Sequence, residues 1–192
     1  MLLIKFQKGQ GLGNQLWNYV VLRKVAELKN YEYKVIDINN FKGKHFLDIE
    51  YTNTNRKVDI SLFDIFKEKL IFDNELKCFI NDYDKELLKI KKDTILEGIF
   101  QSEEYLKPNI DVINKYIKIK NNKKNIFDKN TCILNIRGGE YKSHRNLILP
   151  KSYWLQAISN MKKFKKGLTY KIITDDDKYA SSLLPNYEII KG

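Results

Sequence analysis

The chain has 192 residues and a mass of 22.8 kDa, a length that fits one ordinary domain or two small ones and excludes large multidomain assemblies. Apolar residues make up 43% of the sequence and aromatic residues 12%, which excludes a disordered tail. No apolar run reaches the roughly 18 residues of a membrane span, and the apolar start at residues 1–5 is too short for a signal peptide. We therefore expect a soluble, cytoplasmic protein.

The net charge of +11 comes from 31 lysines and four arginines set against 24 acidic residues. Bidentate hydrogen bonding to bases and phosphates favours arginine, so the excess of lysine over arginine argues against a nucleic-acid partner. Most lysines are interpreted as solvated surface, and the alternative is that they attract anionic substrates or an anionic membrane face. Cys78 and Cys132 lie in apolar stretches without a partner at motif spacing, which predicts buried, reduced thiols rather than a disulfide.

The first forty residues have the pattern of a β-α-β unit, which normally gives a parallel sheet. An apolar strand is expected over Leu2–Gln7, a glycine-rich turn over Lys8–Asn14 and a second strand over Tyr33–Ile38. Helical spacing between the turn and the second strand predicts one buried stripe. The stripe consists of Trp17, Val21, Val25 and Leu28.

The middle of the chain is less regular, and residues 39–94 show no clean period. A buried strand is predicted over Thr94–Phe100, followed by a helix that Ser102 caps and that continues through a stripe of Ile110, Ile113 and Ile117. The stretch Lys120–Asn130 is rich in Lys and Asn and is interpreted as a linker between two domains.

A second strand and helix pattern follows the linker. Strands are expected over Thr131–Ile136 and Tyr170–Thr174, with a helix after Pro150 between them and a short helix over Asp176–Leu184. The expected buried face of the first of these helices consists of Trp154, Ala157, Ile158 and Met161. Because the chain stops soon after an apolar stretch at residues 187–190, this second domain is expected to be incomplete.

The glycine-rich turn is the first candidate site. Gly9, Gly11 and Gly13 let the backbone approach a ligand, and the helix that starts near Asn14 offers free N–H groups to an anion. As a dinucleotide fingerprint the turn lacks its last glycine, although Asp37 falls where a ribose-binding acid would lie. The alternative is a tight turn without a ligand.

Two further candidates follow strands of the second half. Arg137 comes directly after a buried strand, where a fork-shaped contact to phosphate or carboxylate is expected, and an ion pair with Glu140 is the alternative. Asp175 and Asp177 could bind a divalent metal, but acids in the cap and first turn of a helix explain the same pattern. His45 and His144 are interpreted as ordinary polar residues.

Five segments of the chain occur in the order and spacing of a known family. They are Gly11-Leu12-Gly13-Asn14-Gln15-Leu16-Trp17, Leu96-Glu97-Gly98-Ile99-Phe100-Gln101-Ser102-Glu103-Glu104-Tyr105, Leu134-Asn135-Ile136-Arg137-Gly138-Gly139-Glu140-Tyr141, Leu149-Pro150-Lys151-Ser152-Tyr153-Trp154 and Thr174-Asp175-Asp176. Together they resemble glycosyltransferase family 11, the α-1,2-fucosyltransferases.

The resemblance implies a GT-B-like α/β fold with two Rossmann-like parallel-sheet domains, the second incomplete. Residues 1–120 would form the acceptor-side domain with the glycine-rich turn, and residues 131–192 a partial nucleotide-sugar-binding domain. The implied activity is that of a galactoside 2-α-L-fucosyltransferase, which moves fucose from GDP-fucose to a galactoside with inversion and without a metal or other cofactor. Its setting would be surface polysaccharide and lipopolysaccharide biosynthesis.

The resemblance also implies roles for individual residues. Arg137 and Asn14 would act in catalysis, and the donor would be bound by Gly11, Gly13, Asn14, Asn135, Arg137, Glu140, Asp175 and Asp176. Charge that grows on the β-phosphate would then meet an arginine fork and a helix N-terminus that are already oriented. Glu140 and Glu97 are the carboxylates nearest to these segments, and the general base stays open between them, another group and water.

The chain departs from the family pattern in two ways. The family motif His-x-Arg-Arg-x-Asp has Asn135, Gly138 and Glu140 here in place of its histidine, second arginine and aspartate. In addition, the chain ends before the family's Ser/Asn-rich segment. The main alternative is therefore a catalytically inactive, truncated remnant or a carbohydrate-binding module, followed by a metal-dependent transferase that uses Asp175 and Asp177 and by an NAD-dependent enzyme.

The expected partners are a nucleotide sugar and a glycan acceptor, without nucleic acid. Lysines would add a peripheral contact with the inner membrane where the acceptor is linked to lipid. The sequence does not determine an oligomeric state.

Overall fold

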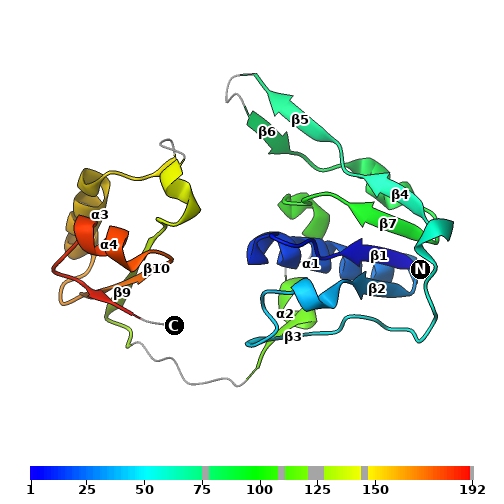
Figure 1. Ribbon diagram of the computed structural model, residues 1–192, viewed down its shortest axis with the longest axis horizontal. Helices are drawn as coiled ribbons and strands as arrows, with labels where there is room; N and C mark the ends of the chain where they lie inside the picture. Colours follow the sequence, from blue (N-terminus) through cyan, green and yellow to red (C-terminus); the bar gives the residue numbers. More distant parts are fainter. Residues whose placement is uncertain (75–77, 108–110, 121–127, 144–146, 191–192) are drawn as a thin grey trace. The chain divides into compact units, whose positions relative to one another are not determined.

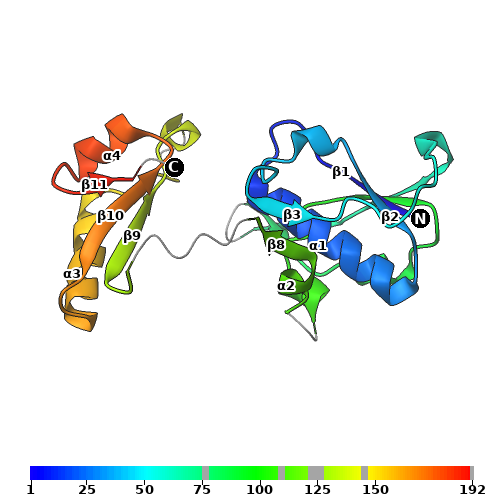
Figure 2. The ribbon, with the colours of Figure 1, turned by 90° about the horizontal axis from the view of Figure 1, so that it is seen from below.

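The computed structural model describes residues 1–74, 78–107, 111–120, 128–143 and 147–190. The chain divides into two compact units, Met1–Asn122 and Lys123–Gly192. Each unit is built on a parallel sheet with helices packed against it (Figures 1 and 2). The predicted α/β, GT-B-like fold class with two parallel sheets is confirmed. No helix within the described ranges is long and apolar enough to cross a membrane.

Unit 1 contains a four-stranded parallel sheet with the strand order β2-β1-β7-β4. Its strands are β1 (Leu2–Lys5), β2 (Tyr33–Ile36), β4 (Asp64–Lys67) and β7 (Thr94–Glu97). Helix α1 (Leu12–Lys29) follows β1 and leads to β2, so the predicted β-α-β unit is confirmed. Figure 2 shows α1 running along one face of this sheet.

Smaller elements complete unit 1. Two antiparallel pairs are formed by β3 (Leu47–Ile49) with β8 (Ile117–Ile119) and by β5 (Leu70–Asp73) with β6 (Cys78–Asn81). The short helices are η1 (Ile38–Asn40), η2 (Ile60–Leu62), η3 (Lys85–Lys89), η4 (Glu103–Leu106) and α2 (Val112–Tyr116). In Figure 1 the β5–β6 hairpin extends beyond β4, away from the centre of the sheet.

The core of unit 1 lies between α1 and the sheet. Val21 and Leu22 of α1 are completely buried, as are Leu2 and Phe6 from β1 and the residues after it. The predicted stripe on α1 is wrong at its last member, since Leu28 is 63% exposed. The helix also packs against α2 and η4, so Tyr19 and Val20, which lie outside the stripe, are buried as well.

The predicted long helix after Ser102 is wrong. Ser102 does cap a helix, since its hydroxyl accepts a hydrogen bond from the Glu104 N–H, but η4 ends at Leu106. Helix α2 contains Ile113 and ends at Tyr116, and Ile117 already belongs to β8. Extended pairing of β8 with β3 competes successfully with the helical spacing of the isoleucines. Ile110 lies outside the described residues.

Unit 2 contains a three-stranded parallel sheet with the order β11-β10-β9 in its described residues. Its elements are β9 (Thr131–Ile136), η5 (Glu140–Ser143), α3 (Lys151–Phe164), β10 (Thr169–Thr174), α4 (Asp177–Leu183) and β11 (Glu188–Ile189). Ile158 of α3 is buried against the sheet, with Trp154 and Met161 packed around it as predicted. Cys132 is a free thiol and is half-buried rather than fully buried, while the side chain of Cys78 lies outside the described part.

A buried carboxylate in unit 1 holds the segment that follows β7. Glu68 is 8% exposed, and its Oε2 accepts hydrogen bonds from the N–H groups of Ile99 and Phe100, both at 2.7 Å. Its Oε1 accepts a bond from the Tyr105 hydroxyl at 2.8 Å. Phe100 adopts a left-handed backbone conformation with φ of 50°, which costs an L-residue roughly 1–2 kcal/mol. Glu68 therefore stabilises a strained turn at the carboxyl edge of the sheet.

We expect Glu68→Ala to lower the free energy of unfolding by roughly 3 kcal/mol, because two buried donors and one part-buried donor lose their acceptor. Urea unfolding followed by circular dichroism measures this change. The matched control is Glu104→Ala, which removes an exposed carboxylate paired with Lys107 and should change the stability by less than about 0.5 kcal/mol. Equal stability of the two variants would contradict a structural role for Glu68.

Candidate functional site

In unit 2 the carboxylate of Asp175 joins the ends of two neighbouring strands. The β9–β10 register pairs Ile136 with Thr174, so the residues that follow these strands lie side by side. Oδ1 of Asp175 accepts a hydrogen bond from the Gly138 N–H at 2.7 Å, and Oδ2 accepts one from Nε of Arg137 at 2.8 Å. These bonds fix the direction of the arginine side chain. The Gly138 N–H, and after it the Arg137 guanidinium, lower the pKa of Asp175 below its ordinary value.

Arg137 is half exposed and has two further neighbours besides Asp175, an aromatic ring and a second carboxylate. The side chain is 47% exposed, and its carbon Cζ lies 4.8 Å from the centre of the Tyr141 ring, a cation–π distance. Glu140, which is 80% exposed, approaches Nη2 to 3.7 Å. The predicted alternative of an ion pair with Glu140 therefore describes a loose contact, and the principal partner of Arg137 is Asp175.

A small pocket of about 120 Å³ adjoins this arginine. Its lining residues are Asn135, Arg137, Tyr141, Leu147, Leu149, Trp154 and Tyr179. Asn135 near the end of β9 and Arg137 directly after it are the polar lining residues, and the rings of Tyr141, Trp154 and Tyr179 form flat apolar walls. The pocket thus combines one cation with surfaces on which a planar group could stack.

Asp176 has a structural role at the start of α4. Its Oδ1 accepts a hydrogen bond from the Tyr179 N–H at 3.0 Å, which makes it the N-cap. Its Oδ2 pairs with Nζ of Lys142. Lys142, and after it the Tyr179 N–H, lower the pKa of Asp176. The predicted helix cap with an acid, Asp177, in the first turn is present.

One of the two residues proposed in the metal alternative, Asp175, is already engaged by other groups. Both oxygens of Asp175 already accept hydrogen bonds, and the Arg137 cation on Oδ2 would repel a second cation. Among the residues that the structure describes, no three His, Cys, Asp or Glu side chains are grouped as metal ligands. His45 is exposed, and His144 lies outside the described residues.

Gly138 occupies the position at which the family motif has its second arginine, and the structure gives a reason for the glycine. A Cβ at this position would lie 2.8 Å from both Cβ of Asp176 and Cδ1 of Tyr179. Such a distance is shorter than any normal contact, so the close packing of the β9 loop against the start of α4 requires glycine here. Arg137 is therefore the arginine that the described residues place at this strand end.

In unit 1 the glycine-rich turn precedes α1 as predicted. Gly9 has φ of 85°, and the turn is closed by a bond from the Gln10 N–H to the Gln7 carbonyl at 3.2 Å. Gly11 is the N-cap and supplies no side-chain hydrogen bond, and the first turn of α1 contains no acidic residue. This end of an 18-residue helix therefore presents backbone N–H groups and the positive end of the helix dipole.

Two of the family-like segments meet beside this turn. Oδ1 of Asn14 accepts a hydrogen bond from Nε2 of Gln101 at 2.6 Å. Gln15 is completely buried, where its Nε2 donates to the Asn40 carbonyl at 2.8 Å and its Oε1 accepts from the Lys42 N–H at 2.9 Å. Asn14 is thus tied to the segment after β7, while Gln15 anchors the helix start to the loop after β2.

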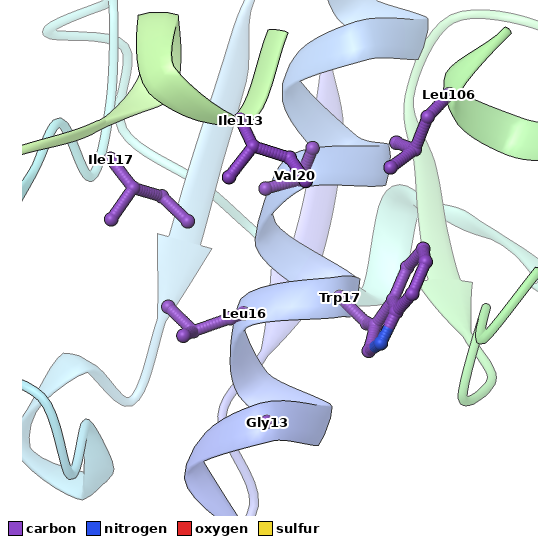
Figure 3. Close-up of a pocket in the computed structure, with 7 residues that line it drawn as sticks. All are labelled: Gly13, Leu16, Trp17, Val20, Leu106, Ile113 and Ile117. Carbon is purple, nitrogen blue, oxygen red and sulfur yellow. The ribbon is translucent and has the colours of Figure 1, made fainter. Parts of the chain in front are cut away.

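An apolar pocket of about 270 Å³ lies next to Gly13. Figure 3 shows Leu16, Trp17 and Val20 pointing from α1 into this pocket. Three apolar residues of η4, α2 and β8 close it from the other side, namely Leu106, Ile113 and Ile117. The helix end that suits an anion therefore lies beside a surface that suits an apolar group.

The structure collects the predicted site residues in two places. Gly11, Gly13 and Asn14 lie at the start of α1 in unit 1, whereas unit 2 brings together Asn135, Arg137, Glu140, Asp175 and Asp176. Sequence reasoning missed the positioning residues Glu68 and Gln15. Glu68 lies in the stretch without a clean period, and its partners are more than 30 residues away, so no local signal could have shown its role.

No protein-family model and no curated protein sequence matches the chain. Among solved structures, the fucosyltransferase NodZ from Bradyrhizobium superposes with a TM-score of 0.51 at 13% identity in its selenomethionine form. A second structure of the same protein gives a TM-score of 0.50 at 12% identity. Each superposition covers 99% of this chain and 78% of the other. At this identity the likeness shows a shared fold.

The lowered pKa of Asp175 leads to a testable pH dependence. A depressed carboxyl pKa stabilises the folded state above the unfolded value of about 3.9, and this contribution is lost as the pH falls through the folded pKa. We expect a ¹³C NMR titration of the Asp175 carboxyl to give a midpoint below about 3.9, with the Gly138 amide proton shifting at the same pH.

The variant Arg137→Ala separates the two causes of this shift. It should raise the midpoint in part while leaving it below about 3.9, because the Gly138 N–H is the larger cause. In Asp175→Asn the corresponding part of the acid-induced loss of stability should disappear. A wild-type midpoint at or above the ordinary value would contradict the carboxylate bridge between the two strand ends.

Proposed function

We propose that the protein transfers fucose from GDP-fucose to a hydroxyl group of a galactoside, with inversion and without a metal. The single observation that carries the proposal is the placement of Arg137 directly after β9, where Asp175 holds Nε and the arginine lines a pocket. Ligands of open α/β sheets bind outside the carboxyl ends of the strands. A guanidinium that is fixed there suits a diphosphate.

The proposed reaction requires positive charge that is already positioned at the leaving phosphate. The bond between fucose C1 and the β-phosphate oxygen breaks, and its electron pair leaves with GDP. The acceptor oxygen forms the new bond to C1 from the opposite face and loses its proton to a base or to water. Arg137 would meet the charge that grows on the β-phosphate, since Asp175 has already oriented the guanidinium before reaction. Within unit 1, Asn14 and the N–H groups at the start of α1 are further candidate donors to an anionic group of the substrate.

The shared fold supports this class of reaction by analogy. Two solved structures that superpose on the chain are those of a fucosyltransferase. On this proposal unit 2 binds the nucleotide sugar and unit 1 the acceptor. A net charge of +11 favours an anionic membrane face, which suits an acceptor linked to lipid and a role in surface polysaccharide synthesis.

A second candidate function is carbohydrate binding without transfer. The observation in its favour is Gly138, because the crowding by Asp176 and Tyr179 excludes a second arginine at this position. Compared with a site that has two arginines, a site with Gly138 at this position would stabilise the charge on the leaving phosphate less. Calorimetric titration of the full chain with GDP-fucose, GDP and UDP-galactose, with and without EDTA, separates the two functions. Guanine-selective binding that EDTA does not change favours the transferase, and binding of none of the three favours the second candidate.

We expect Arg137→Ala to weaken GDP binding by roughly 10- to 100-fold, the loss of a charge-assisted hydrogen bond, and to abolish transfer. Its melting temperature should stay close to that of the wild type, since Asp175 still accepts the hydrogen bond from the Gly138 N–H. Isothermal titration calorimetry and a thermal scan measure the two effects. Arg56→Ala is the matched control, because Arg56 is likewise half exposed and ion-paired but lies in unit 1. Unchanged GDP affinity in Arg137→Ala would return this arginine to a structural role.

Gly13 allows a test of the glycine-rich turn that does not damage the fold. A Cβ at Gly13 would meet nothing within 4 Å, and alanine stabilises helices relative to glycine. We therefore expect Gly13→Ala to keep or raise the melting temperature. If the backbone approaches the diphosphate, the added methyl group should weaken GDP binding by roughly tenfold. An unchanged affinity would show that the helix start does not touch the nucleotide.

A further inference from the structure

Besides the apolar pocket beside Gly13, unit 1 contains a polar cavity, which we call the β1–β7 pocket. It has a volume of about 230 Å³ and lies at the carboxyl ends of the central strands of the sheet. Lys5 and Gln7 reach it from the end of β1, and Glu97 and Gly98 from the end of β7. Strand order reverses at β1, whose two neighbours are β2 and the much later β7. In open α/β sheets such a reversal is where ligands bind.

A buried amide of α1 completes the polar wall of this pocket. Asn18 lines the pocket and is 3% exposed. Its Oδ1 atom has no hydrogen-bond partner among the described residues. A buried acceptor without a partner costs the full desolvation of the group, and the χ2 angle of asparagine rotates over a broad range. A hydroxyl group in the pocket could donate to this amide and remove the cost.

The charges around the β1–β7 pocket are balanced. Nζ of Lys5 lies 3.3 Å from Oδ2 of Asp37, and Oε2 of Glu97 lies 3.7 Å from Nζ of Lys67. A phosphate would face Glu97, and a cation would face Lys5, so neither is well matched. A neutral ligand with several hydroxyl groups can donate to Glu97 and accept from Lys5 without leaving a charge unpaired.

The remaining wall is apolar. It is formed by Ile36, Ile60, Ile65, Ile95 and Leu96. Carbon-rich walls opposite a few polar groups suit a ring that has a C–H face and hydroxyl edges. The volume is below the roughly 300–1,000 Å³ of sites for drug-sized ligands, which matches one sugar ring better than a nucleotide.

We propose that the β1–β7 pocket binds a single neutral pyranose ring. The Asn18 amide oxygen would accept a hydrogen bond from one ring hydroxyl, Glu97 would accept one from a second, and Lys5 would donate one to a third. All residues that line this pocket belong to unit 1, and the proposal does not depend on fucosyl transfer. It gives unit 1 a carbohydrate site of its own.

The test is an NMR titration of the full chain, without nucleotide, in which ¹⁵N-labelled side-chain amides are observed. The probes are methyl β-galactopyranoside and methyl α-mannopyranoside, and glycerol is the control that has hydroxyl groups but no ring. We expect at least one glycoside, and not glycerol, to shift the Asn18 amide and the Gly98 backbone signals. Shifts by neither glycoside, or equal shifts by glycerol, would overturn the proposal.

Asn18→Leu distinguishes a ligand-binding amide from a structural one. Leucine has nearly the shape of asparagine and leaves no buried acceptor, so the melting temperature should rise. The affinity for the glycoside should fall at least tenfold. Asn160→Leu, an exposed position in α3, controls for the change in helix propensity and should leave the affinity unchanged. A lowered melting temperature together with unchanged glycoside affinity would show that the Asn18 amide serves the fold and would overturn the proposal.

Discussion

The carboxylate of Asp175 is the interaction on which the arrangement of unit 2 depends. It accepts hydrogen bonds from the Gly138 N–H and from Nε of Arg137 at the same time. In this way it connects the ends of two adjacent parallel strands. Because both bonds go to one rigid group, the direction of the arginine and the path of the following loop are set together. The close contact of Gly138 with the start of α4 follows from the same bridge. A cation held in this way needs no reorganisation when an anion arrives.

Unit 1 uses buried polar side chains for the same purpose. Glu68 holds the turn after β7, and Gln15 holds the start of α1 against the loop after β2. Buried polar groups are costly unless they are paired, so each of these contacts opposes movement of a loop at the carboxyl edge of the sheet. Asn18 departs from this pattern, since its Oδ1 is buried without a partner. Its position in the pocket between β1 and β7 makes that departure functionally informative.

Prediction from the sequence worked best where one periodic pattern met one clear boundary. Alternation and glycine spacing gave the correct order β1-α1-β2, and Pro150 marked the start of α3. It failed after Ser102, where three isoleucines at helical spacing proved to include a strand residue, Ile117. Pairing with β3 decided that segment, and no local pattern carries the information. The exposure of Leu28 has a similar cause, because burial depends on which elements surround the helix end.

By itself the sequence determined that Arg137 and Asp175 each follow a strand and that glycines precede the first helix. These are properties of short segments, which propensity and periodicity control. Tertiary structure alone decided that the two side chains bond to each other, since the register that pairs Ile136 with Thr174 joins residues 38 positions apart. It also decided that Glu68 supports the turn after β7 and that Gly138 has no room for a side chain. Such contacts arise from how strands and loops pack in space, and sequence spacing does not encode that packing locally.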